Sequence, residues 1–248
     1  MGKELLWGYI DRSGAIAIEP RFHGAGNFQD GLAMVKIDYQ RGFIDRSGHF
    51  VIPPQFQAAG SFSCGLAPVM IDDKWGFIDP EGKFTIPLQY EDAGEFHDGL
   101  AFVKYAGKYG FINPSGEFAI SPRFEGADSF NDGKARVYTD GGWVYIDTKG
   151  DIIEGLREQP ENFAPKFREG LAVMQEGDKF GYVNEEKEFV IKPKFSQAEP
   201  FCDGLARVRT GQNGKWGFIT KDGKQAFPGK FKQADDFHEN LARVLLEV

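Results

Sequence analysis

The stretch DKWGFIDPEGKFTIP, residues 73–87, decides the fold, because variants of its first ten residues occur seven times in the chain. The other copies are LLWGYIDRSG (5–14), YQRGFIDRSG (39–48), GKYGFINPSG (107–116), GGWVYIDTKG (141–150), DKFGYVNEEK (178–187) and GKWGFITKDG (214–223). Successive copies are 34 residues apart four times, then 37 and 36 residues apart. Such a period indicates a repeat protein, in which each unit buries its apolar face against its neighbours.

Each repeat contains the same further signals in the same order. After WGFID come a turn ending in glycine, an alternating FxIxP stretch, a FxxAxxF segment and then GLAxV. Alternation with a period of two predicts β-strands, and the links between them have hairpin length. We therefore expect each repeat to be an antiparallel meander of three strands, or of four if FxxA adds an outer strand.

Seven repeats account for residues 1–248 as one domain. Their approximate bounds, numbered as repeats 1 to 7, are 7–40, 41–74, 75–108, 109–142, 143–179, 180–215 and 216–248. No GLAxV segment precedes LLWGYI, and no WGFI segment follows the final NLARVLLEV. We expect the C-terminal strand to complete the first repeat, giving a seven-bladed β-propeller-like ring with the GLAxV strand innermost. An open β-hairpin solenoid is the alternative.

These motifs, such as KWGFIDPEGKFTIP and FQDGLAMV, resemble the WG-repeat family of tandem β-rich repeats over residues 3–248. The resemblance implies a bacterial-type module used for binding or assembly, with no activity that transfers to particular residues. The departures from the pattern are Arg41 for the aromatic residue, Val144 for the strand glycine, Lys187 for the turn glycine and Lys134 for the leucine of GLA. Repeats 5 and 6 also carry the insertions DIIEGLREQPENFAPKF and RTGQNGKW.

The pair Trp75-Gly76 is unexpected within a strand, because glycine offers no side chain to pack. Tryptophan and glycine point to opposite faces of the strand. We expect the ring to fill the layer between repeats and the glycine to let the neighbouring sheet come close.

Composition narrows the class of protein. The chain is 41% hydrophobic and 27% charged, with 32 glycines and 24 phenylalanines, which suits a soluble all-β protein with many tight turns. A net charge of −8 disfavours nucleic acid as a partner. No apolar run is long enough to span a membrane, and the N-terminus does not have the order of a signal peptide. With Cys64 and Cys202 expected as unpaired thiols, we expect a cytoplasmic protein.

Catalytic and metal-binding patterns are absent from the sequence, so we expect neither an enzyme nor a bound cofactor or metal. His97 and His238 share a phase but belong to distant repeats. Adjacent carboxylates, such as Asp235-Asp236 and Glu185-Glu186, point oppositely or lie on turns. The polar residue that ends WGFID recurs as Asp11, Asp45, Asp79, Asn113, Asp147, Asn184 and Thr220. We interpret it as a turn-forming residue that accepts a backbone N–H two residues on, rather than as a calcium ligand.

Positions that vary on the regular scaffold are the candidates for a binding site. The x of GLAxV and the residue two further on share one strand face. In repeats 3 to 7 they give the predicted ligand-binding residues Phe102, Lys104, Arg136, Tyr138, Arg207, Arg209 and Arg243. The alternative interpretation is that these arginines pair with neighbouring acidic residues as salt bridges across the strands.

The predicted function is a non-catalytic binding or scaffolding protein that recognises a protein segment, a peptide or a small anion. A lectin-like carbohydrate-binding module is the first alternative, because abundant aromatic side chains can stack on sugar rings. A propeller-type glycoside hydrolase is the second, and it needs two carboxylates about 5–10 Å apart in one pocket. The insertion LREQPENFAPKF in repeat 5 is a further candidate binding loop.

Overall fold

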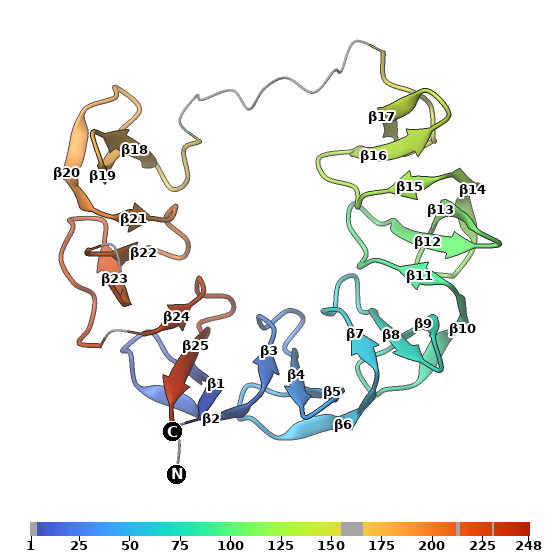
Figure 1. The fold of residues 1–248 in the computed structure, drawn as a ribbon, viewed down its shortest axis with the longest axis horizontal. Helices are drawn as coiled ribbons and strands as arrows, with labels where there is room; N and C mark the ends of the chain where they lie inside the picture. The colour runs from blue at the N-terminus through green and yellow to red at the C-terminus, as the bar shows by residue number, and fades with distance from the viewer. Residues whose placement is uncertain (1–3, 155–165, 212–213, 230) are drawn as a thin grey trace. The chain divides into compact units, whose positions relative to one another are not determined.

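The computed structural model describes residues 4–154, 166–211, 214–229 and 231–248. The described residues form strands and turns and contain no helix. Their strands make seven small antiparallel sheets that follow one another along the chain (Figure 1). The prediction of an all-β chain of repeated antiparallel units is therefore confirmed.

The chain divides into two compact bodies, which we describe separately. The central body is Phe28–Glu161, and the terminal body combines Met1–Asn27 with Asn162–Val248. The first sheet of the central body includes β4 (Ala33–Ile37), β5 (Gln40–Ile44) and β6 (Phe50–Phe56). The second contains β7 (Ala58–Ala59), β8 (Ala67–Ile71), β9 (Lys74–Ile78) and β10 (Phe84–Tyr90). The third contains β11 (Asp92–Ala93), β12 (Ala101–Tyr105), β13 (Lys108–Ile112) and β14 (Phe118–Phe124). The fourth has three strands, β15 (Gly126–Ala127), β16 (Lys134–Thr139) and β17 (Gly142–Asp147).

The terminal body contains a sheet made from both ends of the chain. Its strands, in spatial order, are β2 (Ile16–Phe22), β1 (Leu5–Ile10), β25 (Ala242–Glu247) and β24 (Gln233–Ala234). The pairing of β1 with β25 runs from Leu5↔Glu247 to Ile10↔Ala242. The other two sheets are β18 (Ala172–Glu176), β19 (Lys179–Val183) and β20 (Phe189–Phe195), and β21 (Gln197–Ala198), β22 (Leu205–Arg209) and β23 (Trp216–Thr220).

The FxxA segment forms a strand of two residues that lies beside the GLAxV strand. In the second sheet of the central body, Ala59 on β7 pairs with Val69 on β8, and Val69 pairs in turn with Gly76 on β9. The GLAxV strand therefore lies inside its sheet. The GLAxV strand was expected to be the innermost strand of each repeat. This expectation was wrong, because the short FxxA strand lies beside it at the edge of the sheet.

The strand glycine is required by a bulge in the adjacent strand of the same sheet. A Cβ atom on Gly76 would lie 2.7 Å from the carbonyl oxygen of Ile86 and 2.9 Å from the backbone nitrogen of Leu88, both on β10. The register between β9 and β10 shifts at this point, as it does at a β-bulge. The same approach to backbone atoms occurs at Gly8, Gly42, Gly110 and Gly181. The expectation that the glycine admits a neighbouring sheet was therefore wrong.

Repeat 5 has Val144 where the other repeats have the strand glycine, and the structure of this repeat shows why. After β17, the described residues add the turn at Asp147, a bridge between Ile146 and Ile152, and a hydrogen bond from Ile153 N to Tyr145 O (2.8 Å). No bulged strand presses on position 144 in the described part of this repeat, so a valine side chain is tolerated. Most of the candidate loop LREQPENFAPKF lies outside the described residues, because the description stops at 154 and resumes at 166.

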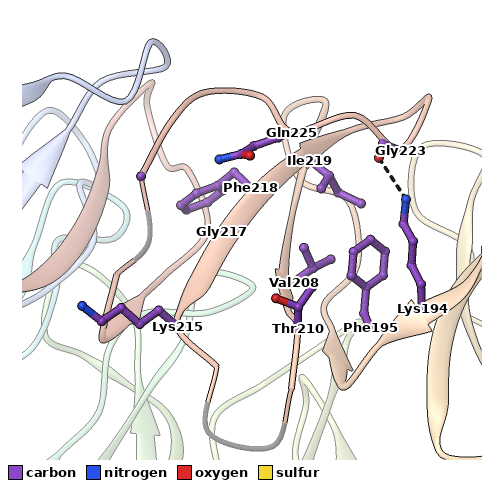
Figure 2. Close-up of a pocket in the computed structure, with 11 residues that line it drawn as sticks. Lys194, Phe195, Val208, Thr210, Lys215, Gly217, Phe218, Ile219, Gly223 and Gln225 are labelled. Carbon is purple, nitrogen blue, oxygen red and sulfur yellow. Dashed lines mark hydrogen bonds between the residues drawn. The ribbon is translucent and has the colours of Figure 1, made fainter.

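Repeat 7 also departs from the pattern, although it keeps the glycine. In this repeat, two isolated bridges, Ile219↔Gln225 and Trp216↔Phe231, join β23 to the chain segment that follows it, which we call the outer segment. A Cβ atom on Gly217 would have the carbonyl oxygen of Gly229, at 3.9 Å, as its nearest neighbour. The outer segment thus stands away from β23 and leaves a hollow beside Gly217 (Figure 2).

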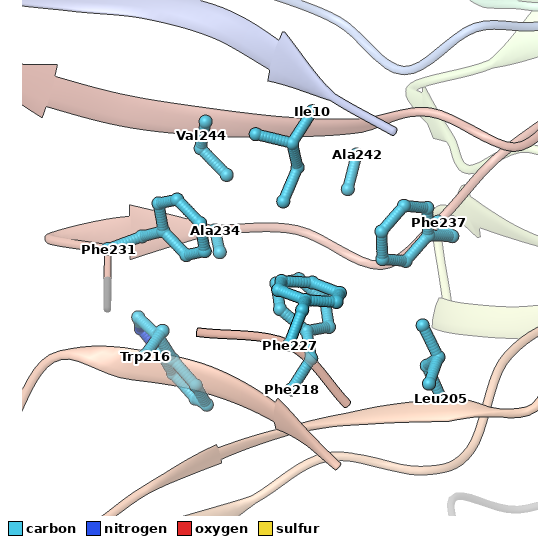
Figure 3. Packing of buried hydrophobic residues seen from close by; sticks show 10 residues of the cluster. All are labelled: Ile10, Leu205, Trp216, Phe218, Phe227, Phe231, Ala234, Phe237, Ala242 and Val244. Atoms are coloured by element: carbon cyan, nitrogen blue, oxygen red, sulfur yellow. The ribbon is translucent and has the colours of Figure 1, made fainter. Parts of the chain in front are cut away.

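The hydrophobic core is a series of layers between neighbouring sheets of a body. In the terminal body, Phe218 from β23 meets Phe227 and Phe237, with ring centroids 5.4 and 5.2 Å apart (Figure 3). Ile10 and Val244 from the sheet of β1 and β25 complete this cluster. Within each body, neighbouring sheets therefore bury their apolar faces against one another, as a repeat protein requires.

The turn that follows WGFID has the predicted form. Asp45 Oδ1 accepts hydrogen bonds from the backbone nitrogens of Ser47 and His49, both at 2.9 Å, and Gly48 has φ 84°. The hydroxyl of Ser47 also donates to this carboxylate and is the main cause of a lowered pKa for Asp45. The interpretation as a turn-forming residue is confirmed here, and Lys187 adopts φ 65° where other repeats have glycine.

Candidate functional site

The predicted binding residues lie beside the aromatic residues of the WG motif. Antiparallel pairing places Lys104 opposite Tyr109, Tyr138 opposite Trp143, and Arg209 opposite Trp216. Since alternate residues share a face of a sheet, the x residue of GLAxV lies diagonally across from the same aromatic ring.

The cationic residues of the predicted set stack on these rings. Within each pair, the distance from the cationic group to the ring centroid is 5.3 Å for Arg243 over Trp7, 5.5 Å for Lys104 over Tyr109, 4.8 Å for Arg136 over Trp143, 5.2 Å for Arg207 over Trp216 and 4.6 Å for Arg209 over Trp216. Each such contact contributes about 0.5–1 kcal/mol where it is exposed. These side chains therefore contribute to the scaffold whether or not they contact a ligand.

Three of the arginines also form ion pairs. Arg136 Nε lies 2.7 Å from Asp128 Oδ2, and Arg207 Nε lies 2.6 Å from Asp236 Oδ1. Asp235 pairs with both Arg207 (3.4 Å) and Arg243. The salt-bridge interpretation thus describes these arginines, and the adjacent carboxylates Asp235-Asp236 serve as their partners.

The sequence carries a signal for this pairing that the prediction missed. The residue after the alanine of FxxA is acidic in the three repeats with arginine at x, as in Asp128/Arg136, Glu199/Arg207 and Asp235/Arg243. Asp128/Arg136 and Asp235/Arg243 are ion pairs, whereas Arg207 pairs with Asp235 and Asp236. The position is glycine in Gly26/Met34, Gly60/Pro68 and Gly94/Phe102, and it is Pro165 before Val173. The two positions lie next to each other, because the backbone nitrogen of Gly94 donates to Phe102 O at 3.0 Å. A Cβ atom on Gly94 would collide with the Phe102 ring, so a bulky apolar residue at x requires glycine.

The seven predicted residues do not form one described cluster. Phe102, Lys104, Arg136 and Tyr138 belong to the central body, whereas Arg207, Arg209 and Arg243 belong to the terminal body. Asp235 links Arg207 with Arg243. Lys104 and Phe102 gather around Tyr109, with 6.0 Å between the Phe102 and Tyr109 ring centroids. Arg209 lies over Trp216 and its buried Nε has no hydrogen-bond partner among the described residues.

One group of predicted residues is exposed to solvent together with aromatic rings. Tyr138 is 42% exposed and Trp143 is 46% exposed, and their ring centroids lie 5.5 Å apart in an edge-to-face arrangement. We call Asp128, Arg136, Tyr138 and Trp143 the repeat-5 patch, after Trp143; the other three residues belong to repeat 4 and lie in or directly beside the same sheet. Trp143 and Asp128 were not in the predicted set.

The exposure of Trp143 has a structural cause. In other repeats, the aromatic residue of the WG strand pairs with an aromatic residue at the end of the strand that carries FxIxP. Examples are Trp75↔Tyr90 and Tyr109↔Phe124. Among the described residues of repeat 5 there is no such outer strand beside β17. The missing FxIxP motif in this repeat is the sequence signal that could have identified the patch.

The remaining chemical groups form no further cluster of this kind. Both Cys64 and Cys202 are free thiols, and His97 lies 3.9 Å from Glu95. Across the described ranges, no three His, Cys, Asp or Glu side chains gather closely enough to hold a metal ion. The described chain also has no helix that is long and apolar enough to cross a membrane.

These features define a class of protein, a tandem-repeat β protein in which four of the seven sheets present a cation-stacked aromatic residue on the WG strand. The family model of the WG containing repeat matches residues 7–40, 42–75, 75–109, 109–143, 180–216 and 216–247. The matches cover most of the chain, so this chain belongs to the family of WG containing repeats. The unmatched residues between 143 and 180 are those of repeat 5, which has Val144 and the insertion.

Several solved structures are similar to this chain, all with little sequence identity. The AfRom2 CNH domain is 9% identical, with a TM-score of 0.41, over 92% of this chain and 94% of that chain. The extracellular domain of the putative one component system BT4673 from B. thetaiotaomicron is 10% identical, with a TM-score of 0.40, over 98% of this chain and 42% of that chain. Apo AztD from Citrobacter koseri is 12% identical, with a TM-score of 0.38, over 95% and 83%. No curated protein matches the sequence. At these TM-scores, the account of this chain depends on its own sheets and on the family match.

Proposed function

We propose that this chain is a non-catalytic binding protein that holds a segment of another protein on the repeat-5 patch. The observation that carries the proposal is the joint exposure of Trp143 and Tyr138 at 46% and 42%. Trp216, in the same position of repeat 7, is only 8% exposed. The aromatic rings at this position in the other repeats, Trp7, Trp75, Tyr109, Phe180 and Trp216, are partly or fully buried, and Trp143 is the exposed one among them.

The chemistry of the patch suits a protein segment with an apolar side chain. Tryptophan, tyrosine and arginine are the residue types most enriched at binding hot spots. The two rings of Trp143 and Tyr138 are fixed edge to face, so little side-chain entropy is lost when an apolar group packs on them. The Tyr138 hydroxyl and the Trp143 indole N–H provide polar groups that can bond to a peptide backbone. Arg136 is already paired with Asp128, so the patch favours an apolar segment over an acidic one.

The other predicted residues have a smaller part in this proposal. Phe102 and Lys104 occupy the equivalent positions on β12 of the same body, where they pack around Tyr109. Arg207 and Arg243 are held by Asp235 in the terminal body. Direct ligand contact by these residues stays a prediction. A cytoplasmic location is part of the proposal and suits the two free cysteines.

A carbohydrate is the second candidate ligand, and the exposure of Trp143 is the observation that favours it. An exposed indole face can stack on the apolar face of a sugar ring. A glycan array distinguishes the two candidates, because a protein-segment site gives no array signal that depends on Trp143. For the hydrolase alternative, the adjacent pair Asp235-Asp236 is engaged with Arg207.

The proposal is tested by affinity capture from cells of the native host. We expect the double variant Tyr138→Ala/Trp143→Ala to lose the partner that the wild-type chain recovers. Its melting temperature should decrease only slightly, because both side chains are partly exposed and the variant loses the stacking of Arg136 on Trp143. Tyr39→Ala is the matched control, since Tyr39 is an 87% exposed aromatic residue of the same body outside the patch. Equal recovery of the same partner by the double variant and the control would contradict the proposal.

A further inference from the structure

The hollow beside Gly217 lies in the terminal body and takes no part in the proposed function. In five other repeats the strand glycine is required because backbone atoms of the adjacent strand press on it. Among the described residues, that requirement is absent at Gly217, where the nearest atom to an added Cβ would be Gly229 O, 3.9 Å away. A larger side chain here would instead enter the hollow, which Gly217 lines together with Gly223 and Gly229.

The hollow has the size and the walls of a small-molecule site. Its volume is about 340 Å³, within the range of ligand pockets. An apolar cavity of about 150 Å³ already admits benzene. The apolar walls include the buried side chains of Phe195, Val208 and Ile219, which come from β20, β22 and β23 (Figure 2). These walls would hold a compact apolar group.

The charged lining of the hollow is entirely cationic. Lys194 and Lys215 line it, and no aspartate or glutamate is among its described lining residues. This is unusual for a chain with a net charge of −8. Lys194 is the better placed of the two, because its Nζ donates to Gly223 O at 3.3 Å and lies 5.2 Å from the centroid of the Phe195 ring (Figure 2). A lysine ammonium has three donors, so the hydrogen bond to Gly223 leaves capacity for an anion.

We propose that this pocket binds a small organic acid, with the apolar body against Phe195, Val208 and Ile219 and the carboxylate at Lys194. The open shape of the outer segment of repeat 7 creates the site. The sequence of that segment, KQAFPGKF, accounts for the shape, because Gln225 replaces the phenylalanine of FxIxP and Gly229 follows the proline.

The test is a titration of the full chain with phenylacetate, followed by NMR of its labelled valine and isoleucine methyl groups and by calorimetry. We expect saturable shifts at Val208 and Ile219, which line the pocket, and none at Ile44, which is buried in the central body. 2-Phenylethanol has the same apolar body without the charge, and inorganic phosphate has charge without the apolar body. Both should bind at least about tenfold more weakly, because a hydrogen bond to a charged group contributes about 1.5–3 kcal/mol.

Two variants locate the ligand. Lys194→Gln should weaken phenylacetate binding by about tenfold or more. Lys192→Gln, a change on the same strand outside the pocket lining, should leave it unchanged. Gly217→Leu fills the pocket and should abolish the shifts, with its melting curve as the check on folding. The proposal is overturned if phenylacetate causes no saturable shift, if 2-phenylethanol binds equally well, or if Lys194→Gln behaves like Lys192→Gln.

Discussion

Substituting the strand glycine gives a quantitative test of the bulge that shapes each repeat. In Gly76→Ala, the new Cβ would lie 2.7 Å from Ile86 O and 2.9 Å from Leu88 N, so the backbone of β10 must move. Overpacking of this kind costs about 1–3 kcal/mol. Replacing glycine by alanine also lowers the entropy of the unfolded chain, which stabilises the fold by about 0.4–1 kcal/mol where alanine fits.

Gly217→Ala is the matched control, because it has the same effect on the unfolded chain. Its Cβ would be 3.9 Å from its nearest neighbour, so the overpacking cost is absent. The two variants should therefore differ in the free energy of unfolding by the overpacking cost alone, about 1–3 kcal/mol. Urea denaturation followed by circular dichroism measures this difference, with equal slopes for the two variants. If Gly76→Ala is as stable as Gly217→Ala, the bulge is not the reason for the glycine.

Three further predictions concern side chains of the scaffold. Asp45→Ala should lower the free energy of unfolding by about 0.5–1.5 kcal/mol, because the Ser47 N–H loses its acceptor, whereas Asp45→Asn should retain most of it. Because the pKa of Asp45 is lowered in the folded state, its contribution to stability is present above the unfolded pKa of about 3.9 and is lost as the pH falls below it. In acid, the free energy of unfolding should therefore decrease more steeply with falling pH for the wild type than for Asp45→Asn. Burial and a hydrogen bond to Asp92 raise the pKa of Tyr109 to about 12. The free energy of unfolding should therefore fall between pH 10 and 12, and it should fall less in Tyr109→Phe. Alkaline denaturation of the two proteins measures this difference. Arg207→Ala should lower the free energy of unfolding by about 1–3 kcal/mol in urea denaturation, because it leaves the half-buried Asp236 carboxylate without its ion-pair partner.

The sequence predicts the repeats well because the period of the motif and the alternation within it are local signals. The polar residue of WGFID is also predictable, since Asp45 and Gly48 form a turn from their own chemistry. The role of Gly76 is not, because it depends on a register shift between β9 and β10 that no local pattern records. The pairing strand must be known before the atoms that approach the glycine can be named.

The candidate site was only partly predictable for a similar reason. Arg136 and Tyr138 were identified as variable residues of a strand face, and the structure adds Trp143 on the opposite strand. Among the described residues of repeat 5, no FxIxP strand pairs with Trp143, so its exposure does not follow from the regular pattern of the repeats. The pairing of arginine with an acidic residue could have been found by comparing Asp128/Arg136 with Gly94/Phe102 across repeats.

Site-specific crosslinking in cells of the native host tests the proposed binding function most directly. The variant Tyr138→p-benzoylphenylalanine places a photoreactive group in the repeat-5 patch, and Tyr39→p-benzoylphenylalanine places the same group on an exposed site outside it. The proposal predicts that light links position 138 to a defined peptide of one partner protein, and that position 39 gives no such product. The same products from both positions, or a product at 138 that carries a glycan instead of a peptide, would contradict it.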